Sequence, residues 1–183
     1  MPFVHDPRFD PYMTAIGQVA TGWAEYEGLL NNLIWNLANV ERMVGSCITS
    51  QMIGPGPRFR SIVALLHFRS APEALIKKFN SHHTDAEKFA AQRNRFLHDS
   101  LVRNNETGQM ARVEITADKR LRHDIVLVEI REIEKIRDDI GRLIDRLAEL
   151  CARVTAELPP WPQTQFEQSA GILRQHIKND DSA

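Results

Sequence analysis

Cysteine is scarce in this chain of 183 residues, which contains only Cys47 and Cys151. Two cysteines so far apart form neither a disulfide framework nor the closely spaced pairs of a structural zinc site. The opening stretch, Met-Pro-Phe-Val-His-Asp-Pro, also lacks the basic and apolar regions of a secretory signal. We therefore expect a reducing, cytoplasmic setting.

Long apolar runs are missing as well. Although 43% of the residues are hydrophobic, no run approaches the roughly eighteen apolar residues of a transmembrane helix, so we expect no membrane association. The chain has no glycine-rich phosphate loop, no Gly-x-Ser-x-Gly turn and no Cys-x-x-Cys pair, which disfavours nucleotide hydrolysis of the usual kind and disulfide exchange. The length suits one domain, which we place at residues 1–158, followed by a C-terminal tail at 159–183.

Charge is unevenly distributed along the chain. The net formal charge is −1, yet residues 56–103 carry nine basic and four acidic side chains, while the segments on either side are net acidic. This basic excess favours an anionic ligand near the segment. An ordinary solvated face of Lys and Arg explains the same charges equally well.

Apolar residues recur at helical spacing through most of the sequence. The tetrapeptide Gly54-Pro55-Gly56-Pro57 is a strong helix breaker, and Thr84 with Glu87 matches a capping box that starts a new helix. The pattern predicts helices at 11–39, 41–52, 57–70, 72–79, 84–102 and 130–158.

Residues 110–116 and 121–128 are instead rich in β-branched side chains. They predict a β-hairpin at about 109–128. The expected fold is therefore mainly α, a bundle of five or so helices with one inserted β-hairpin.

The string Arg93-Asn94-Arg95-Phe96-Leu97-His98 is the most informative stretch of the chain. On a helix of about 100° per residue, Asn94 and His98 share a face and Arg93 flanks it. A fixed cation, an amide and an imidazole could therefore converge on one anion. A long earlier helix carries Trp23 and Glu27 four residues apart, and a polar loop at 103–108 follows the motif.

This layout resembles the HEPN superfamily over roughly Ile16 to Leu158. The superfamily consists of small helical domains marked by an Arg, a polar residue and a His four to six residues after the Arg. Many members are metal-independent RNases of toxins and antiviral systems, and others have no known catalysis. The resemblance implies a homodimer in which two motifs face one cleft.

The residue types fit that chemistry. Cleaving RNA without a metal requires a base for the 2′-hydroxyl, an acid for the leaving 5′-oxygen and cations for the charged phosphorane. His98 is the candidate proton carrier, Arg93 the candidate phosphate clamp, and Asn94 the residue that orients phosphate or imidazole. We expect no cofactor and no metal.

Arg93 also has a structural interpretation. It falls on the apolar stripe of its predicted helix, as Glu27 does on the first helix, and a buried guanidinium is costly unless paired. We therefore expect Arg93 and Glu27 to meet directly as a bidentate pair, with Glu27 and Trp23 supporting the site.

The other histidines are weaker candidates. His82, His83 and Glu87 are conceivable metal ligands, but adjacent histidines at a helix start more often face solvent. His67 lies in an apolar helix and is expected to be a core or interface residue.

Two functions stay open at this level. The first is a homodimeric, metal-independent endoribonuclease of toxin or phage-defence type, with RNA as substrate and an antitoxin or other protein as partner. The alternative is a noncatalytic helical dimerisation or interaction module, in which Arg93 and Glu27 are structural and His98 caps the following loop.

Overall fold

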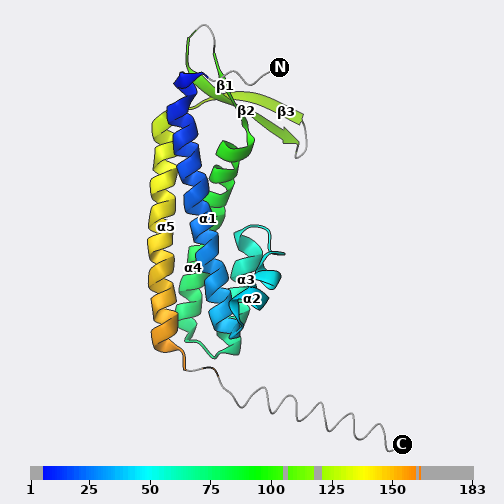
Figure 1. Cartoon of the computed structure of the whole chain (residues 1–183), viewed down its shortest axis with the longest axis vertical. Coiled ribbons are helices and arrows are strands. Elements are labelled where there is room, and N and C mark those ends of the chain that lie inside the picture. The colour runs from blue at the N-terminus through cyan, green and yellow to red at the C-terminus, as the bar shows by residue number, and fades with distance from the viewer. Residues whose placement is uncertain (1–5, 105–106, 118–120, 160, 162–183) are drawn as a thin grey trace, which may run out of the picture.

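The computed structural model describes residues 6–104, 107–117, 121–159 and 161. Three long helices, α1 (Asp10–Ala38), α4 (Glu73–His98) and α5 (Ile130–Glu157), form an elongated bundle (Figure 1). Two shorter helices, α2 (Arg42–Thr49) and α3 (Pro55–Phe68), lie beside it, and a 3₁₀ turn, η1 (Pro7–Phe9), precedes α1. A small sheet sits at the end of the bundle where α1 begins (Figure 1).

The core forms where the apolar stripes of α1, α3, α4 and α5 meet. Helices α1 and α5 pack along their length, because each repeats large apolar residues every three or four positions. The largest fully buried side chains include Trp23, Tyr26, Phe59, Phe79, Leu30, Leu37, Ile133, Ile140 and Leu143. Helix α2 packs against α1 at Gly45, where a Cβ atom would lie only 2.3 Å from Trp35, so this close approach requires glycine.

The predicted fold class is confirmed. The chain is mainly helical, and an antiparallel hairpin is inserted between α4 and α5. The observed bounds of α1, α3 and α5 differ from the predicted ones by one or two residues, which is the usual scatter at frayed ends. Helix α2 is shorter than the predicted 41–52.

Helix α4 corrects one prediction. We expected separate helices at 72–79 and 84–102, but α4 runs without interruption from Glu73 to His98. Thr84 does not cap a new helix, because its hydroxyl donates to the carbonyl of Asn80 at 3.2 Å within the helix. Burial of Phe79, His82 and Ala86 on one stripe favours a continuous helix over the local capping signal.

The end of α4 brings a second correction. The helix stops at His98, and Leu101, which we expected to be helical, belongs to strand β1 (Ser100–Arg103). Strands β2 (Met110–Ala117) and β3 (Leu121–Leu127) form the predicted hairpin, and β1 adds an antiparallel third strand beside β2. The sheet order is therefore β1-β2-β3.

The two faces of this sheet differ in polarity. Arg112 lies over the Phe96 ring of α4 at 5.2 Å and pairs with Asp99 and Glu114, so the charged face meets the end of α4. Val113 follows Arg112 in β2 and therefore lies on the opposite face of the sheet. Its cross-strand partner Ile125 shares that face. That face leaves large apolar side chains in solvent, namely Ile115, Leu121, Ile125 and Leu127.

Across the described ranges, none of the helices combines the length and apolar character that crossing a membrane requires.

Candidate functional site

A cleft of about 390 Å³ opens between α1, the connection from α2 to α3, and the last turns of α4. All five residues that the sequence singled out line it, together with Met52, Ile53, Gly54, Pro55, Arg58 and Ala90; the five are Trp23, Glu27, Arg93, Asn94 and His98. Two helices whose motifs lie far apart in the sequence thus contribute to one cavity. We call it the motif cleft.

Helix α4 presents the three motif residues in graded exposure. Arg93 is half-buried, whereas Asn94 and His98 are exposed. Nη1 of Arg93 donates a hydrogen bond of 2.7 Å to Oδ1 of Asn94, so the amide helps to fix the guanidinium. Nε of Arg93 is buried and has no hydrogen-bond partner among the described residues.

Trp23 forms the floor beneath Arg93. Its side chain is only 2% exposed, and the guanidinium carbon lies 5.7 Å from the ring centroid. This is a cation–π contact, which is strengthened where water is excluded. Trp23 is too buried to stack on a base, so its contribution is to hold Arg93 in place.

The prediction that Glu27 pairs with Arg93 is wrong. Glu27 Oε1 instead lies 3.6 Å from Nη1 of Arg58, and no ion pair within 4.0 Å joins Glu27 to Arg93 in the described chain. Arg58 is the more buried of the two cations, with 8% of its side chain exposed. A buried charge has the greater need of a counterion, and Arg58 enters the same gap from α3.

Sequence reasoning missed Arg58. Its Nε donates to Oδ1 of Asn31 at 2.9 Å, and its Nη1 donates to the carbonyl of Gly54 at 2.7 Å. A signal was available, because Arg58 precedes the buried Ile62 and Leu66 by four and eight positions and so belongs to the buried stripe of α3. A cation in such a stripe usually has a specific partner.

His98 is the last residue of α4. Its imidazole has no hydrogen-bond or ion-pair partner among the residues that the structure describes. The adjacent charges are held elsewhere, because Asp99 lies 3.7 Å from Arg95 and 3.6 Å from Arg112. The ring is therefore free to meet a ligand or a second protein molecule.

His82 differs from the expected solvent-facing residue. It is 4% exposed, and its Nε2 lies 3.0 Å from the hydroxyl of Tyr26. Burial, assisted by the positive charge of Arg146, lowers the pKa of His82 to about 4. Burial likewise raises the pKa of Tyr26. This pair is a neutral hydrogen bond of the core.

Neither His83 nor His67 belongs to a candidate metal centre among the described residues. His83 stacks on Phe59 at 4.7 Å and lies 3.2 Å from Glu87. No group of three candidate ligands capable of holding a metal occurs in the part of the chain that the structure covers. His67 is exposed on α3 rather than placed in the core.

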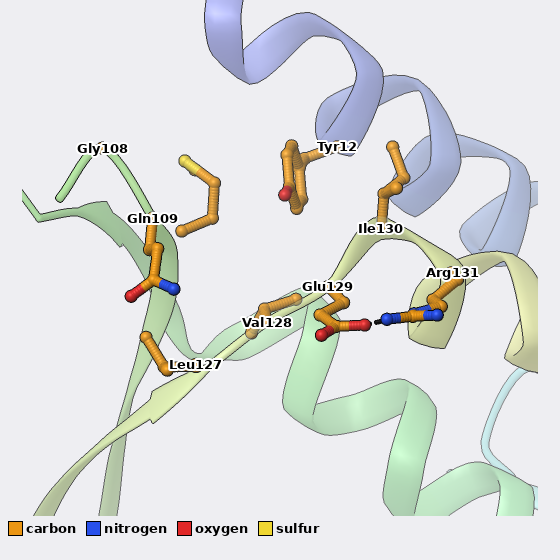
Figure 2. Close-up of a pocket in the computed structure, with 9 residues that line it drawn as sticks. Tyr12, Gly108, Gln109, Leu127, Val128, Glu129, Ile130 and Arg131 are labelled. Atoms are coloured by element: carbon orange, nitrogen blue, oxygen red, sulfur yellow. Dashed lines mark hydrogen bonds and ion pairs between the residues drawn. The ribbon is translucent and has the colours of Figure 1, made fainter.

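A second groove, of about 350 Å³, lies at the N-terminal end of α1 near the β1–β2 loop (Figure 2). It is lined by Tyr12, Gln109, Leu127 and Val128 among others, and at its rim the carboxylate of Glu129 pairs with Arg131 (Figure 2). The lining has no imidazole or thiol, so it offers no proton carrier for neutral pH. Of the two cavities, the motif cleft is therefore the better candidate for a functional site.

No protein-family model matches this sequence, and neither curated proteins nor solved structures provide a match.

Proposed function

We propose that the protein is a metal-independent endoribonuclease of HEPN type, acting as a homodimer in a toxin or phage-defence role. The observation that carries the proposal is that Arg93, Asn94 and His98 line one open cleft, with Trp23 beneath the arginine. A half-buried guanidinium and a free imidazole on adjacent turns of one helix suit a phosphodiester better than a neutral ligand.

The reaction needs only the substrate and these side chains. The RNA 2′-oxygen forms a bond to phosphorus, the bond from phosphorus to the 5′-oxygen breaks, and a 2′,3′-cyclic phosphate results. The 2′-hydroxyl proton passes to a base, and an acid protonates the leaving 5′-oxygen. His98 carries protons, Arg93 stabilises the negative charge of the phosphorane, and Asn94 orients Arg93 through their hydrogen bond.

A second copy of the chain supplies what one cleft lacks. The only histidine that lines the motif cleft among the described residues is His98, and one imidazole cannot easily act as base and acid in the same step. A twofold dimer, the commonest symmetric assembly, would place two His98 side chains at one substrate.

The test is cleavage of single-stranded RNA by the purified protein in EDTA, with the product ends identified by mass spectrometry. We expect 2′,3′-cyclic phosphate ends and a dimer by light scattering at micromolar concentration. Absence of cleavage across varied RNA substrates would contradict the proposal. A strictly monomeric protein would contradict the dimeric mechanism.

The apolar outer face of the sheet favours a second candidate, a noncatalytic dimerisation or interaction module. Ile115, Leu121, Ile125 and Leu127 are 55% to 77% exposed, and contiguous exposed apolar side chains mark contact surfaces. If this candidate is correct, the Ile125→Lys substitution abolishes self-association. Neither the wild-type protein nor this variant then cleaves RNA. Association that is unchanged in Ile125→Lys would argue against this surface.

A further inference from the structure

Arg58 is a buried cation, and the hydrogen bonds that it forms within the described residues do not use all of its N–H donors. Nε is bound to Asn31 and Nη1 to the carbonyl of Gly54, while the nearest carboxylate oxygen, from Glu27, is 3.6 Å from Nη1. An arginine carries five N–H donors. Arg58 lines the motif cleft, and its Nη2 has no partner within the described residues.

Arg93 also has a hydrogen-bond donor without a partner among the described residues. Its Nη1 is occupied by Asn94, whereas its buried Nε lacks a partner among the described residues. The edge made by Nε and Nη2 is the one through which arginine forms two parallel bonds to a carboxylate or phosphate. Both arginines line the same cavity, and each has a donor without a partner among the described residues.

The charges that line the cavity do not balance. Arg58 and Arg93 contribute two permanent positive charges, and Glu27 is the one carboxylate among the described lining residues. Half-buried and buried guanidiniums lose much of their hydration. An anion in the cleft would supply both the missing charge and the missing acceptors.

We propose that Arg58 and Arg93 together bind one phosphate group in the motif cleft, with Arg58 as the fixed half of the clamp. Arg58 is held from two sides by Asn31 and Gly54, so its orientation is set before a ligand arrives. That this phosphate belongs to RNA rests on the proposed function. The anion site itself does not depend on cleavage.

A purely structural role for Arg58 makes a different prediction. In that case Arg58 only fastens the start of α3 to α1 and neutralises Glu27, and Glu27→Gln leaves anion binding unchanged. In the clamp, Glu27 competes with the ligand for the guanidinium. Removing its charge should then strengthen anion binding.

The experiment uses the full chain and two probes, inorganic phosphate and a 2′-deoxy-substituted RNA oligonucleotide that cannot be cleaved. Binding of each is followed by NMR of the ¹⁵N-labelled protein. We expect Arg58→Gln to weaken both by roughly tenfold or more, since a lost charge-assisted bond is of that size. Arg60→Gln, which removes the same charge from an exposed position of α3 outside the cleft lining, should change binding less than about twofold.

A second pair of variants guards against unfolding. If Arg58→Gln leaves Glu27 unpaired and destabilises the fold, the double variant Glu27→Gln with Arg58→Gln removes both charges and should fold while still binding weakly. Glu27→Gln alone should bind phosphate more tightly than the wild type. Equal binding by wild type and folded Arg58 variants, or no gain in Glu27→Gln, would overturn the clamp.

The outcomes also separate the clamp from the nuclease. Phosphate binding that depends on Arg58 without any RNA cleavage supports the anion site and contradicts the nuclease. RNA cleavage that is unaffected by Arg58→Gln contradicts the clamp and leaves the nuclease standing. A wild-type protein that binds neither probe at millimolar concentration refutes the anion site.

Discussion

The two halves of α4 differ sharply in their surroundings. Residues 73–86 contain every buried side chain of the helix, including Phe79 and His82, whereas residues 87–98 contain none. The first half is enclosed by α1, α3 and α5, and the second half runs out towards the sheet (Figure 1). One helix therefore serves the core at one end and presents the motif residues at the other.

Two histidines make the comparison concrete. His82 is buried against Tyr26, and burial keeps it neutral by lowering its pKa to about 4. His98 is exposed, without a partner in the described chain, and it lines the motif cleft. Because a general acid or base must come within hydrogen-bond reach of its substrate, of these two histidines only His98 is accessible to a ligand in the motif cleft. The position of a histidine in the bundle, and not its residue type, therefore decides whether it is a core residue or an accessible one.

The largest expected effect is on activity in the exposed half. His98→Ala should reduce RNA cleavage by about 10² to 10⁴-fold, the range for loss of a general acid or base. The free energy of unfolding should change by no more than about 0.5 kcal/mol, as for most surface substitutions. Single-turnover cleavage and urea unfolding measure the two quantities. Undiminished cleavage by the variant would show that His98 is not the proton carrier.

The buried half should show the reverse behaviour. Phe79→Ala should lower the free energy of unfolding by roughly 3 to 5 kcal/mol, because it leaves a cavity in the core. Phe96→Ala is the matched control in the second half, where the ring is only partly buried, and it should cost less. Urea titrations of both variants check the order. A larger loss for Phe96 would mean that the two ends of α4 do not differ in packing.

Acidification should destabilise the protein through His82. Burial gives the ring a pKa of about 4 in the folded protein, against an ordinary value of 6.5, so between these two pH values the unfolded chain binds a proton that the folded protein does not. Stability is therefore full above about pH 6.5 and falls as the pH drops towards 4, by up to about 3 kcal/mol. His82→Gln should lose this part of the pH dependence, and His98→Ala should retain it. Equal slopes for wild type and His82→Gln would exclude the mechanism.

The smallest effect concerns the hydroxyl that faces His82. Tyr26→Phe removes the 3.0 Å hydrogen bond and leaves the imidazole nitrogen without its partner, which should cost roughly 1 to 3 kcal/mol. Tyr12→Phe, at a half-exposed position of α1, should cost less than about 0.5 kcal/mol. Thermal melts at neutral pH compare the two. A neutral Tyr26→Phe change would show that water or backbone readily replaces the hydroxyl.

Much of the architecture was predictable because it depends on local periodicity. The stripes of α1 and α5 repeat every three or four residues, and the β-branched run after residue 109 alternates at a period of two. The motif was readable for the same reason, since helical spacing alone places Asn94 and His98 on one face. The short β1 strand gave no comparable signal, because four residues cannot establish a period.

Most of the helices, the hairpin and the spacing of Arg93, Asn94 and His98 could be predicted from the sequence, because each depends on neighbours within a few residues. The continuity of α4, the burial of His82 and the pairing of Glu27 with Arg58 follow instead from tertiary packing. Those outcomes depend on which distant side chains occupy the same space. Burial and charge pairing are properties of that three-dimensional neighbourhood, and local periodicity does not encode them.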